Sequence, residues 1–499
     1  MEFNTNQRKV GIMKNEKCTG SIACVQRMLN TVYRGCATLL MLTLSVNVTN
    51  ATTWYVSTNG NDNATGADWD TAFRTIQKAI DIAPAGSEIV VSNGTYAPIS
   101  TDNKTITIRS VNGAETTIID GDGKYRCVTV GIFSSRTNTV LIGFTLQNGY
   151  TTGDGGGAAG GTLYDCVLTN NIAARGGGVC HGLLFNCTLE NNTARGYGGG
   201  AYWGTLNNCT LTGNRATYAG VSGSAYGGGT YNSTLNNCIL AGNVASTSGT
   251  RDPSHAYGGG AYGGVLNNCT LVGNTASLIT YVGQTYSTDR TANGGGVYGG
   301  TLNNCIVWGN SFILRGTGHN HINCTFSYSC TTPSPGGTGN ITSDPLFMDF
   351  ANGDYRLKPH SPCVNKGSNA LAVGDTDVEG NPRIIYGTVD MGAYESVVMP
   401  YNAWLDYYET GHSLVNTNKW LMGLDPHDVN AAFLATIEMQ DGKPYVGWIP
   451  NLRGYRSYTV ETKVDLSDRQ EQWQDVAPKD VPSLPPTSSR FFRVRVTLP

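Results

Sequence analysis

Six copies of one short repeat occupy residues 155–310, and their spacing limits what the chain can form. Each copy has a Gly-Gly-Gly triplet and, nine residues after its last glycine, a cysteine: Cys166, Cys187, Cys209, Cys238, Cys269 and Cys305. A Leu stands three residues before each cysteine, a Leu or Val two after it, and an Asn five after it. The segment from that Asn to the next triplet lengthens along the chain from 4 to 5, 12, 14 and 19 residues. A constant core with one variable segment is typical of a solenoid whose inserted loops emerge on one face.

The two shortest repeats, of 21 and 22 residues, are too short for a helical hairpin and are rich in Gly, Thr, Asn and Tyr. They therefore predict one turn of a β-solenoid. Cys209 and Leu211 can share a strand face, but Leu206 lies three residues before Cys209, so the chain must bend between them. Asn208 occupies the bend, where Asn tolerates the left-handed backbone of a tight corner. Stacked coils would align Leu, Cys and Asn in ladders, with amide hydrogen bonds from coil to coil.

The repeats resemble the right-handed parallel β-helix of pectate-lyase-like and pectinesterase-like proteins. Their recurring Gly-Gly-Gly-x-Tyr pattern is similar to that of polymorphic outer-membrane adhesins. Upstream, apolar residues at helical spacing predict an amphipathic helix over 73–82, which in such proteins caps the N-terminal end of the solenoid. Further strands are expected at 105–109, 117–119 and 140–146.

Downstream, Asp344–Phe347, Asp354–Leu357 and Val389–Glu395 resemble the closing coils of bacterial secreted β-helix proteins. After residue 397 the triplets stop, and alternating strands at 445–448, 457–462 and 491–497 resemble a small C-terminal module of such proteins. That module is expected either to attach to a surface or glycan or to shield the end of the rod.

The expected fold class is therefore all-β: a right-handed parallel β-helix with an N-terminal capping helix and a small C-terminal β-sandwich-like domain. Residues 1–51 would be an N-terminal extension plus signal peptide, and 397–499 the C-terminal β-rich module. The β-helix would cover 52–396, with regular repeats over 155–310 and closing coils over 311–396.

Composition and the N-terminal region bear on location and partners. An apolar run over 36–48 after Arg34 is too short to span a bilayer and is typical of a secretory signal peptide. We therefore expect a secreted or cell-surface protein with no membrane span after cleavage, acting as a monomer. A net charge of −3 gives no indication of a nucleic-acid partner. The ladder cysteines are expected to be small buried hydrophobic residues rather than disulfides, whereas Cys324, Cys330 and Cys363 fit disulfides better.

Charged and aromatic residues indicate a ligand-binding edge. All five arginines of the repeats lie in the variable segment, and one per coil would offer planar donors to carboxylates or sulfates: Arg175, Arg195, Arg215, Arg251 and Arg290. Arg315 follows the last repeat. Tyrosines stand two residues after four triplets, with a tryptophan beside the first: Tyr202, Trp203, Tyr231, Tyr262 and Tyr298. Tyr can stack on sugar rings. The alternatives without a ligand are that the arginines are solvated surface charges and that the tyrosine stack only stabilises the fold.

Residues with catalytic potential are few. Asp252 and Asp289 lie in the two longest loops with His255 and Arg290 nearby, a set that could abstract a proton beside a uronate or hold Ca²⁺ for a lyase. The acid-rich motifs of polygalacturonases and the Gln and Asp motifs of pectinesterases are absent, so the resemblance covers fold and not active site.

Two further patterns could bind metal. His319 and His321 lack a third clear ligand, and the oxygen-rich segment 375–381 fits a turn with Asx hydrogen bonds better than a Ca²⁺ loop. No cofactor is therefore expected, with Ca²⁺ the one candidate.

The sequence favours a non-enzymatic, adhesin-like carbohydrate-binding protein with acidic extracellular or cell-wall polysaccharide as ligand. A polysaccharide lyase or glycoside hydrolase acting on uronate-containing glycans is one alternative, and a structural spacer without ligand is the other.

Overall fold

The computed structural model describes residues 52–131, 139–220, 222–248, 254–280 and 289–397, together with the backbone of five strands between 434 and 497. The proposed signal peptide lies outside the described residues, as do Arg251 and Asp252. No helix among the described residues is long and apolar enough to cross a membrane.

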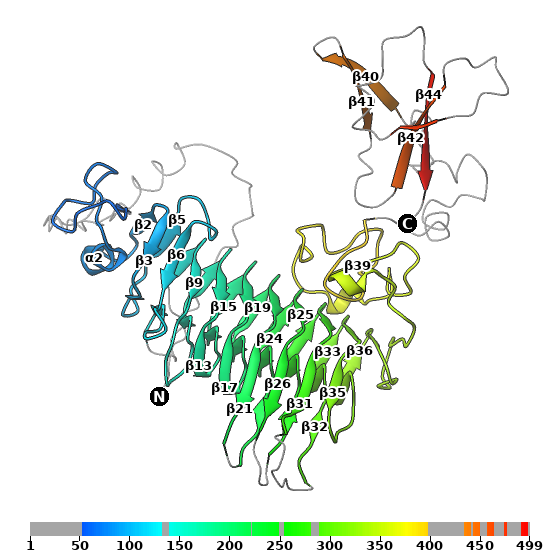
Figure 1. Cartoon of the computed structure of the whole chain (residues 1–499), viewed down its shortest axis with the longest axis horizontal. Helices are drawn as coiled ribbons and strands as arrows, with labels where there is room; N and C mark the ends of the chain where they lie inside the picture. The colour runs from blue at the N-terminus through cyan, green and yellow to red at the C-terminus, as the bar shows by residue number, and fades with distance from the viewer. Residues whose placement is uncertain are drawn as a thin grey trace, which may run out of the picture. The chain divides into compact units, whose positions relative to one another are not determined.

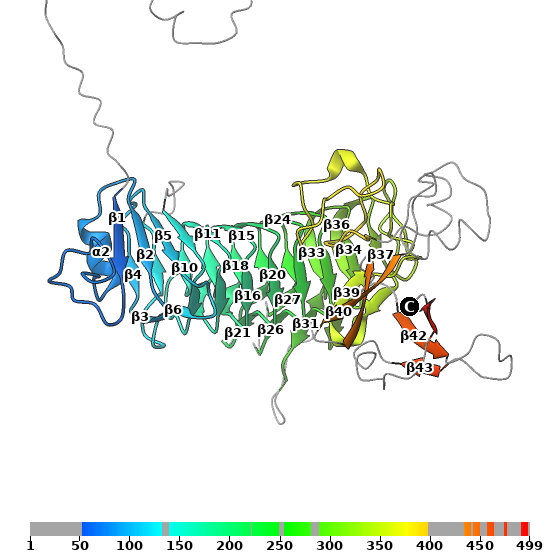
Figure 2. The ribbon, with the colours of Figure 1, turned by 90° about the horizontal axis from the view of Figure 1, so that it is seen from above.

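The N-terminal end of the coil stack is covered by a short helix, α2 (Ile76–Ile82), as Figures 1 and 2 show. It buries Ile76, Ala79 and Ile80, so the predicted capping helix is confirmed. The helix begins three residues later than predicted, because the Thr75 side chain accepts the backbone N–H of Lys78 and caps the first turn. Phe73 instead forms a parallel bridge with Val56, the last residue of β1 (Thr53–Val56).

Each regular coil contributes strands to three parallel sheets of 18, 10 and 9 strands. In one coil, β18 (Ala201–Tyr202) and β19 (Thr205–Asn207) join the first sheet, β20 (Thr210–Thr212) the second and β21 (Arg215–Tyr218) the third. The third sheet also takes the strand that precedes the next triplet, β22 (Ala225–Tyr226). Equivalent strands of successive coils pair in register, as Leu206 does with Leu235 of β24 (Thr234–Asn236). The predicted parallel β-helix is therefore confirmed.

Upstream of the regular repeats the predicted strands also exist, with small shifts. They are β5 (Thr107–Ser110), β6 (Thr117–Asp120), β8 (Val140–Ile142) and β9 (Thr145–Gln147). The expected single strand over 140–146 is two strands, since Gly143 at φ +73° turns the chain from the first sheet into the second.

The interior of the coils is the predicted apolar ladder. The leucines before and after each cysteine are buried, and the six ladder cysteines are at most 1 % exposed. All eleven cysteines in the described part of the chain are unpaired, including Cys324, Cys330 and Cys363. The ladder cysteines therefore act as small core residues, as expected. Each corner residue before a ladder cysteine has a positive φ of 50–53°, including Asn208, which confirms the predicted left-handed bend.

The Asn that closes each repeat forms a fully internal hydrogen-bonded ladder. In a typical step, Asn243 Nδ2 donates to Asn274 Oδ1 at 2.9 Å and to the Leu211 carbonyl at 2.9 Å, while its backbone N–H also donates to Asn274 Oδ1. The amides are buried away from water. These contacts therefore make the hydrogen bonds that water would make at an exposed amide. The ladder members are Asn171, Asn192, Asn214, Asn243, Asn274, Asn310 and Asn320.

Residues 344–397, the closing segment, have little regular structure, chiefly β38 (Phe347–Asp349) and β39 (Asp354–Leu357). The later part of this segment packs against the outer face of the second sheet, where Met391 and Ala393 join Ile306 in one apolar cluster. The segment 375–381 is a turn in which Asp377 Oδ1 accepts the backbone N–H groups of Glu379 and Asn381. The buried Arg383 guanidinium lies 2.9 Å from Glu395 and donates to three backbone carbonyls. These polar contacts fix a segment that has few strands of its own.

The C-terminal region has two antiparallel sheets. One pairs β40 (Leu434–Gln440) with β41 (Lys443–Ile449), and the other has the order β43 (Gln474–Val476), β42 (Ser457–Lys463), β44 (Phe491–Thr497). The expected β-rich module is therefore present as strands.

Candidate functional site

Four of the predicted ligand-binding tyrosines form one ladder on the first sheet. Tyr202 pairs in register with Tyr231, Tyr231 with Tyr262, and Tyr262 with Tyr298. Their strands are β18, β23 (Thr230–Tyr231), β28 (Ala261–Tyr262) and β33 (Val297–Asn303). The small residue before each tyrosine is fully buried, so strand alternation directs the rings outward, as predicted. We call this the first tyrosine ladder.

A second tyrosine ladder, which the sequence analysis missed, lies on the other side of the Gly-Gly-Gly corner. Tyr197 of β17 (Thr193–Tyr197), Tyr226 and Tyr257 of β27 (Ala256–Tyr257) pair in register on the third sheet. The sequence signal was a tyrosine directly before three triplets. Tyrosines of the two ladders contact each other edge to face, with ring centroids 5.0 Å apart between Tyr226 and Tyr262.

The ring geometry corrects the expectation that these tyrosines stack on sugars. Within the first ladder, neighbouring rings are 5.1–5.5 Å apart and 1–11° from parallel. Within the second ladder they are 5.0–5.4 Å apart and 7–22° from parallel. The faces of interior rings are therefore covered by their neighbours, and only ring edges and hydroxyls can meet a ligand. Trp203 is different, because it is 51 % exposed beside the first ring and keeps a face available for stacking.

The predicted arginine ladder does not form. Arg175 of β13 (Ile172–Arg175) pairs with Tyr197 across a register shift, whereas Arg215 pairs with Thr193. Arg195 lies on β17 between Thr193 and Tyr197, the residues that pair with Arg215 and Arg175. The exposed arginines therefore occupy different columns. The coils enter the third sheet in one register, with the residue after each closing Asn paired from coil to coil, but the arginines stand four, three and one residues after that Asn.

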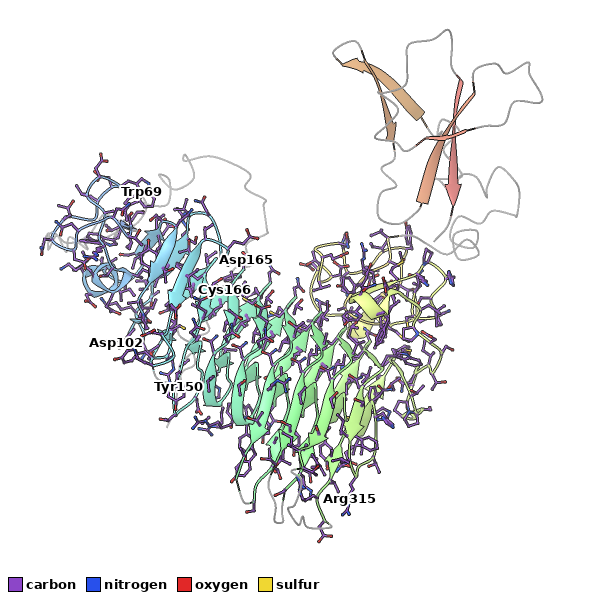
Figure 3. The ribbon with its side chains drawn as sticks, viewed as in Figure 1. Trp69, Asp102, Tyr150, Asp165, Cys166 and Arg315 are labelled. Carbon is purple, nitrogen blue, oxygen red and sulfur yellow. The ribbon has the colours of Figure 1, made fainter. Side chains whose placement is uncertain are left out.

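Arg290 also differs from the prediction. Its side chain is buried and donates to the carbonyls of Thr247 and Ile279, so it is not on a ligand-facing edge. Arg315, by contrast, is exposed near the C-terminal end of the third sheet (Figure 3).

An open cleft of about 660 Å³ lies beside the N-terminal coils, where the sequence analysis placed no site residue. Its lining comes from α2, β4 (Ile99–Ser100) and the turns after β6 and β9. Two aromatic residues contribute, Tyr125, which is 64 % exposed, and Tyr150, whose place is shown in Figure 3. Lys124 and Arg126 are the only charged lining residues, and both are cations.

Two nearby carboxylates are held in ion pairs, whereas Asp81 and Asp102 accept hydrogen bonds from the lining residues Gln77 and Ser100. Asp122 lies 2.6 Å from Lys124 Nζ, an exposed pair of little energetic weight. Asp154 accepts two hydrogen bonds from the Arg175 guanidinium at 2.6 and 2.7 Å. Burial lowers the pKa of Arg126. Its guanidinium donates to the carbonyls of Asp154 and Gly155 and is thereby fixed at the cleft wall.

Two contacts between an arginine and a tyrosine ring connect the cleft with the ladders. The Arg195 guanidinium lies 5.8 Å from the ring centroid of Tyr150, at the cleft, and Arg175 lies 5.1 Å from the ring centroid of Tyr202. Both are cation–π contacts, which fix a guanidinium while leaving its outer edge to solvent. The cleft, the two arginines and the ladders therefore follow one another along the same edge of the coils.

The predicted catalytic set is only partly described, and its described members are engaged elsewhere. His255 Nδ1 lies 3.0 Å from Thr291 Oγ1, Asp289 is exposed, and Arg290 is buried as stated. The two histidines do not form a site either: His321 bonds the Pro333 carbonyl, and His319 packs on Phe312. Within the described ranges no group of three or more His, Cys, Asp or Glu side chains is placed to hold a metal ion.

No protein-family model matches the sequence, and neither does any curated protein. Among solved structures, the chain is similar to a pectate lyase, Pel9A, at 14% identity over 69% of this chain and 96% of that one, with a TM-score of 0.36. It is similar to a rhamnogalacturonan lyase at 14% identity over 72% and 99%, with a TM-score of 0.36. It is also similar to the pectin methylesterase PemA from Erwinia chrysanthemi at 12% identity over 50% and 80%, with a TM-score of 0.24. Likeness at these TM-scores is too distant to bear on function, and the fold rests on the strand pairing above.

Proposed function

We propose that this protein is an exported or cell-surface binding protein for acidic polysaccharide and that the cleft is its principal subsite. The observation that carries the proposal is the cleft lining: every charged residue in it is a cation, and Tyr125 presents a strongly exposed ring. A uronate could stack on Tyr125 while its carboxylate meets Lys124 or Arg195. The apolar run over 36–48 supports export.

Isothermal titration with polygalacturonate and alginate fragments tests this proposal. We expect binding that weakens with added salt, because ion pairs with exposed cations are screened. Tyr125→Ala and Arg195→Ala should each weaken binding by about tenfold, the loss expected for one aromatic or charge-assisted contact. Lys366→Ala, an exposed lysine in the closing segment, serves as the control for loss of one positive charge.

Two results would overturn the proposal. One is the absence of heat with every acidic glycan at low salt. The other is equal binding of a neutral glucan, which would show that the cations do not select the ligand. Absorbance of unsaturated chain ends, followed in the same mixtures, would identify lyase action if it rose with time.

A further inference from the structure

The two tyrosine ladders repeat at the interval of the coils. Successive ring centroids in both ladders are 5.0–5.5 Å apart, slightly more than the spacing of about 4.8 Å between paired strands of successive coils. An extended polysaccharide repeats at a similar interval per sugar. A glycan chain lying parallel to the rod axis could therefore meet an equivalent set of groups at every residue.

The ladders offer hydroxyls rather than ring faces. None of the seven tyrosine hydroxyls is both buried and without a partner. Burial raises the pKa of Tyr231 and Tyr262, so these phenols stay protonated at neutral pH and can donate hydrogen bonds. A hydroxyl that donates to a carboxylate forms a charge-assisted bond, which is stronger than a neutral one.

Neither ladder itself contains an acidic side chain, although Asp154 pairs with Arg175 one coil before the second ladder. The second ladder is preceded by Arg175 and followed by Asn293. In the column of the first ladder, Cys180 pairs with Tyr202 from the coil before it, and Ile322 pairs with Tyr298 from the coil after it. A polyanion placed along the ladders would therefore meet phenols and neutral side chains, because the one carboxylate at the start of these columns, Asp154, is neutralised by the Arg175 guanidinium.

We propose that the two tyrosine ladders bind a polyuronate chain in extended form, parallel to the rod axis, with one sugar for each coil beyond the cleft. This inference rests on the proposed function, because the chain would enter the ladders from the cleft past Arg195 and Arg175. Phenol hydroxyls donate to successive carboxylates, and the exposed face of Trp203 takes a sugar at the start of the first ladder. The four rungs of that ladder set the length of the site.

A length series of oligogalacturonates distinguishes this site from a purely structural tyrosine stack. We expect affinity to rise with chain length for about four sugars beyond those that fill the cleft, one for each rung, and then to level off. The double variant Tyr231→Phe and Tyr262→Phe keeps both rings and their stacking but removes two donors. It should weaken binding of long chains by about tenfold and leave short chains unaffected.

The matched control is Tyr164→Phe, which removes a hydroxyl from a stacked tyrosine–phenylalanine pair. Tyr164 lies 4.7 Å from Phe185 with an interplanar angle of 8°, outside both ladders, and its variant should bind all lengths like the wild type. If short chains bind but affinity does not rise with length, or if the double variant matches the wild type at every length, the ladder site is wrong while the cleft remains. If no chain binds the wild type, the proposed function itself fails.

Discussion

At the scale of single residues, the repeat predicted which side chains face inward but not which polar ones become most buried. The sequence predicts amide hydrogen bonds from coil to coil, and the continuous, buried ladder is made by the Asn five residues after each cysteine rather than by the corner Asn before it. Arg290 is expected on a ligand-facing edge because it lies, like the other arginines of the repeats, in the variable segment. The carbonyls of Thr247 and Ile279, which come from different coils, take it into the interior instead.

The closing segment contains buried carboxyls whose titration should affect stability. Burial raises the pKa of Glu395 from 4.5 to about 9 and that of Asp390 from 3.8 to about 7. Between the unfolded and folded pKa values the folded chain holds a proton that the unfolded chain has lost. Stability should therefore fall as pH rises through that window.

Glu395→Gln tests this effect, because an amide has no charge to bury yet can still accept the backbone N–H of Asp390. The wild type should lose stability between pH 7 and 9, because folded Glu395 keeps a proton there that the unfolded chain has lost, and the variant should not. Denaturant midpoints measured across this range provide the comparison, with the exposed Glu115→Gln as control. Equal slopes in wild type and Glu395→Gln would show that this carboxyl does not titrate there.

At the scale of elements, the strands and corners of the regular coils could be predicted because each obeys a local rule. Side chains alternate between the two faces of a strand, which places the leucines inside. The tolerance of Asn for left-handed backbone accounts for the bend before each cysteine. The cleft could not be predicted in this way. Tyr125 and Tyr150 stand in coils without the regular repeat, and only stacking brings their turns together. Arginine columns failed for a different reason: the coils enter the third sheet in one register, but the arginines stand at different distances from the closing Asn.

The Gly-Gly-Gly corner is an element whose middle position cannot hold a larger residue. A Cβ on Gly228 would overlap the Gly259 carbonyl oxygen of the next coil and the backbone of Val244. Gly228→Ala should therefore cost about 3 kcal/mol or more in stability, because two backbones must separate. Gly242→Ala is the control, since Gly242 has φ +63° but no atom within 4 Å of the added Cβ, and should cost about 1 kcal/mol. Similar denaturant midpoints for the two variants would contradict close coil contact at the corner.

At the scale of the whole molecule, the β-helix is a sum of coils that each contact only their neighbours. Stability in such a solenoid is close to a sum over coils and their interfaces, so length can change without loss of the fold. The loops differ in length and the coils do not, which is why the repeat predicted the architecture well and the surface less well.

Deletion of residues 188–209 removes 22 residues, which is one complete coil, and joins Cys187 to Thr210. All ladders stay in register, so we expect a folded, shorter and less stable rod. Deletion of 188–198 removes half a coil and leaves the chain unable to reach the next corner, so that variant should not fold. Far-ultraviolet circular dichroism and small-angle scattering measure both outcomes. A folded half-coil variant, or an unfolded full-coil variant, would contradict the nearest-neighbour view.

The internal asparagine ladder has a direction. Every Nδ2 donates to the Oδ1 of the following coil, so the amide dipoles point the same way and their positive ends face the C-terminal closure. The two ends of the row therefore need opposite partners: Asn171 Oδ1 accepts the Gly149 N–H, and Asn320 Nδ2 donates to the Thr332 carbonyl. A coil grafted onto the C-terminal end must supply an acceptor, and one grafted onto the N-terminal end a donor. The rod is thus polar in the manner of a filament, and only head-to-tail joining could continue its interior.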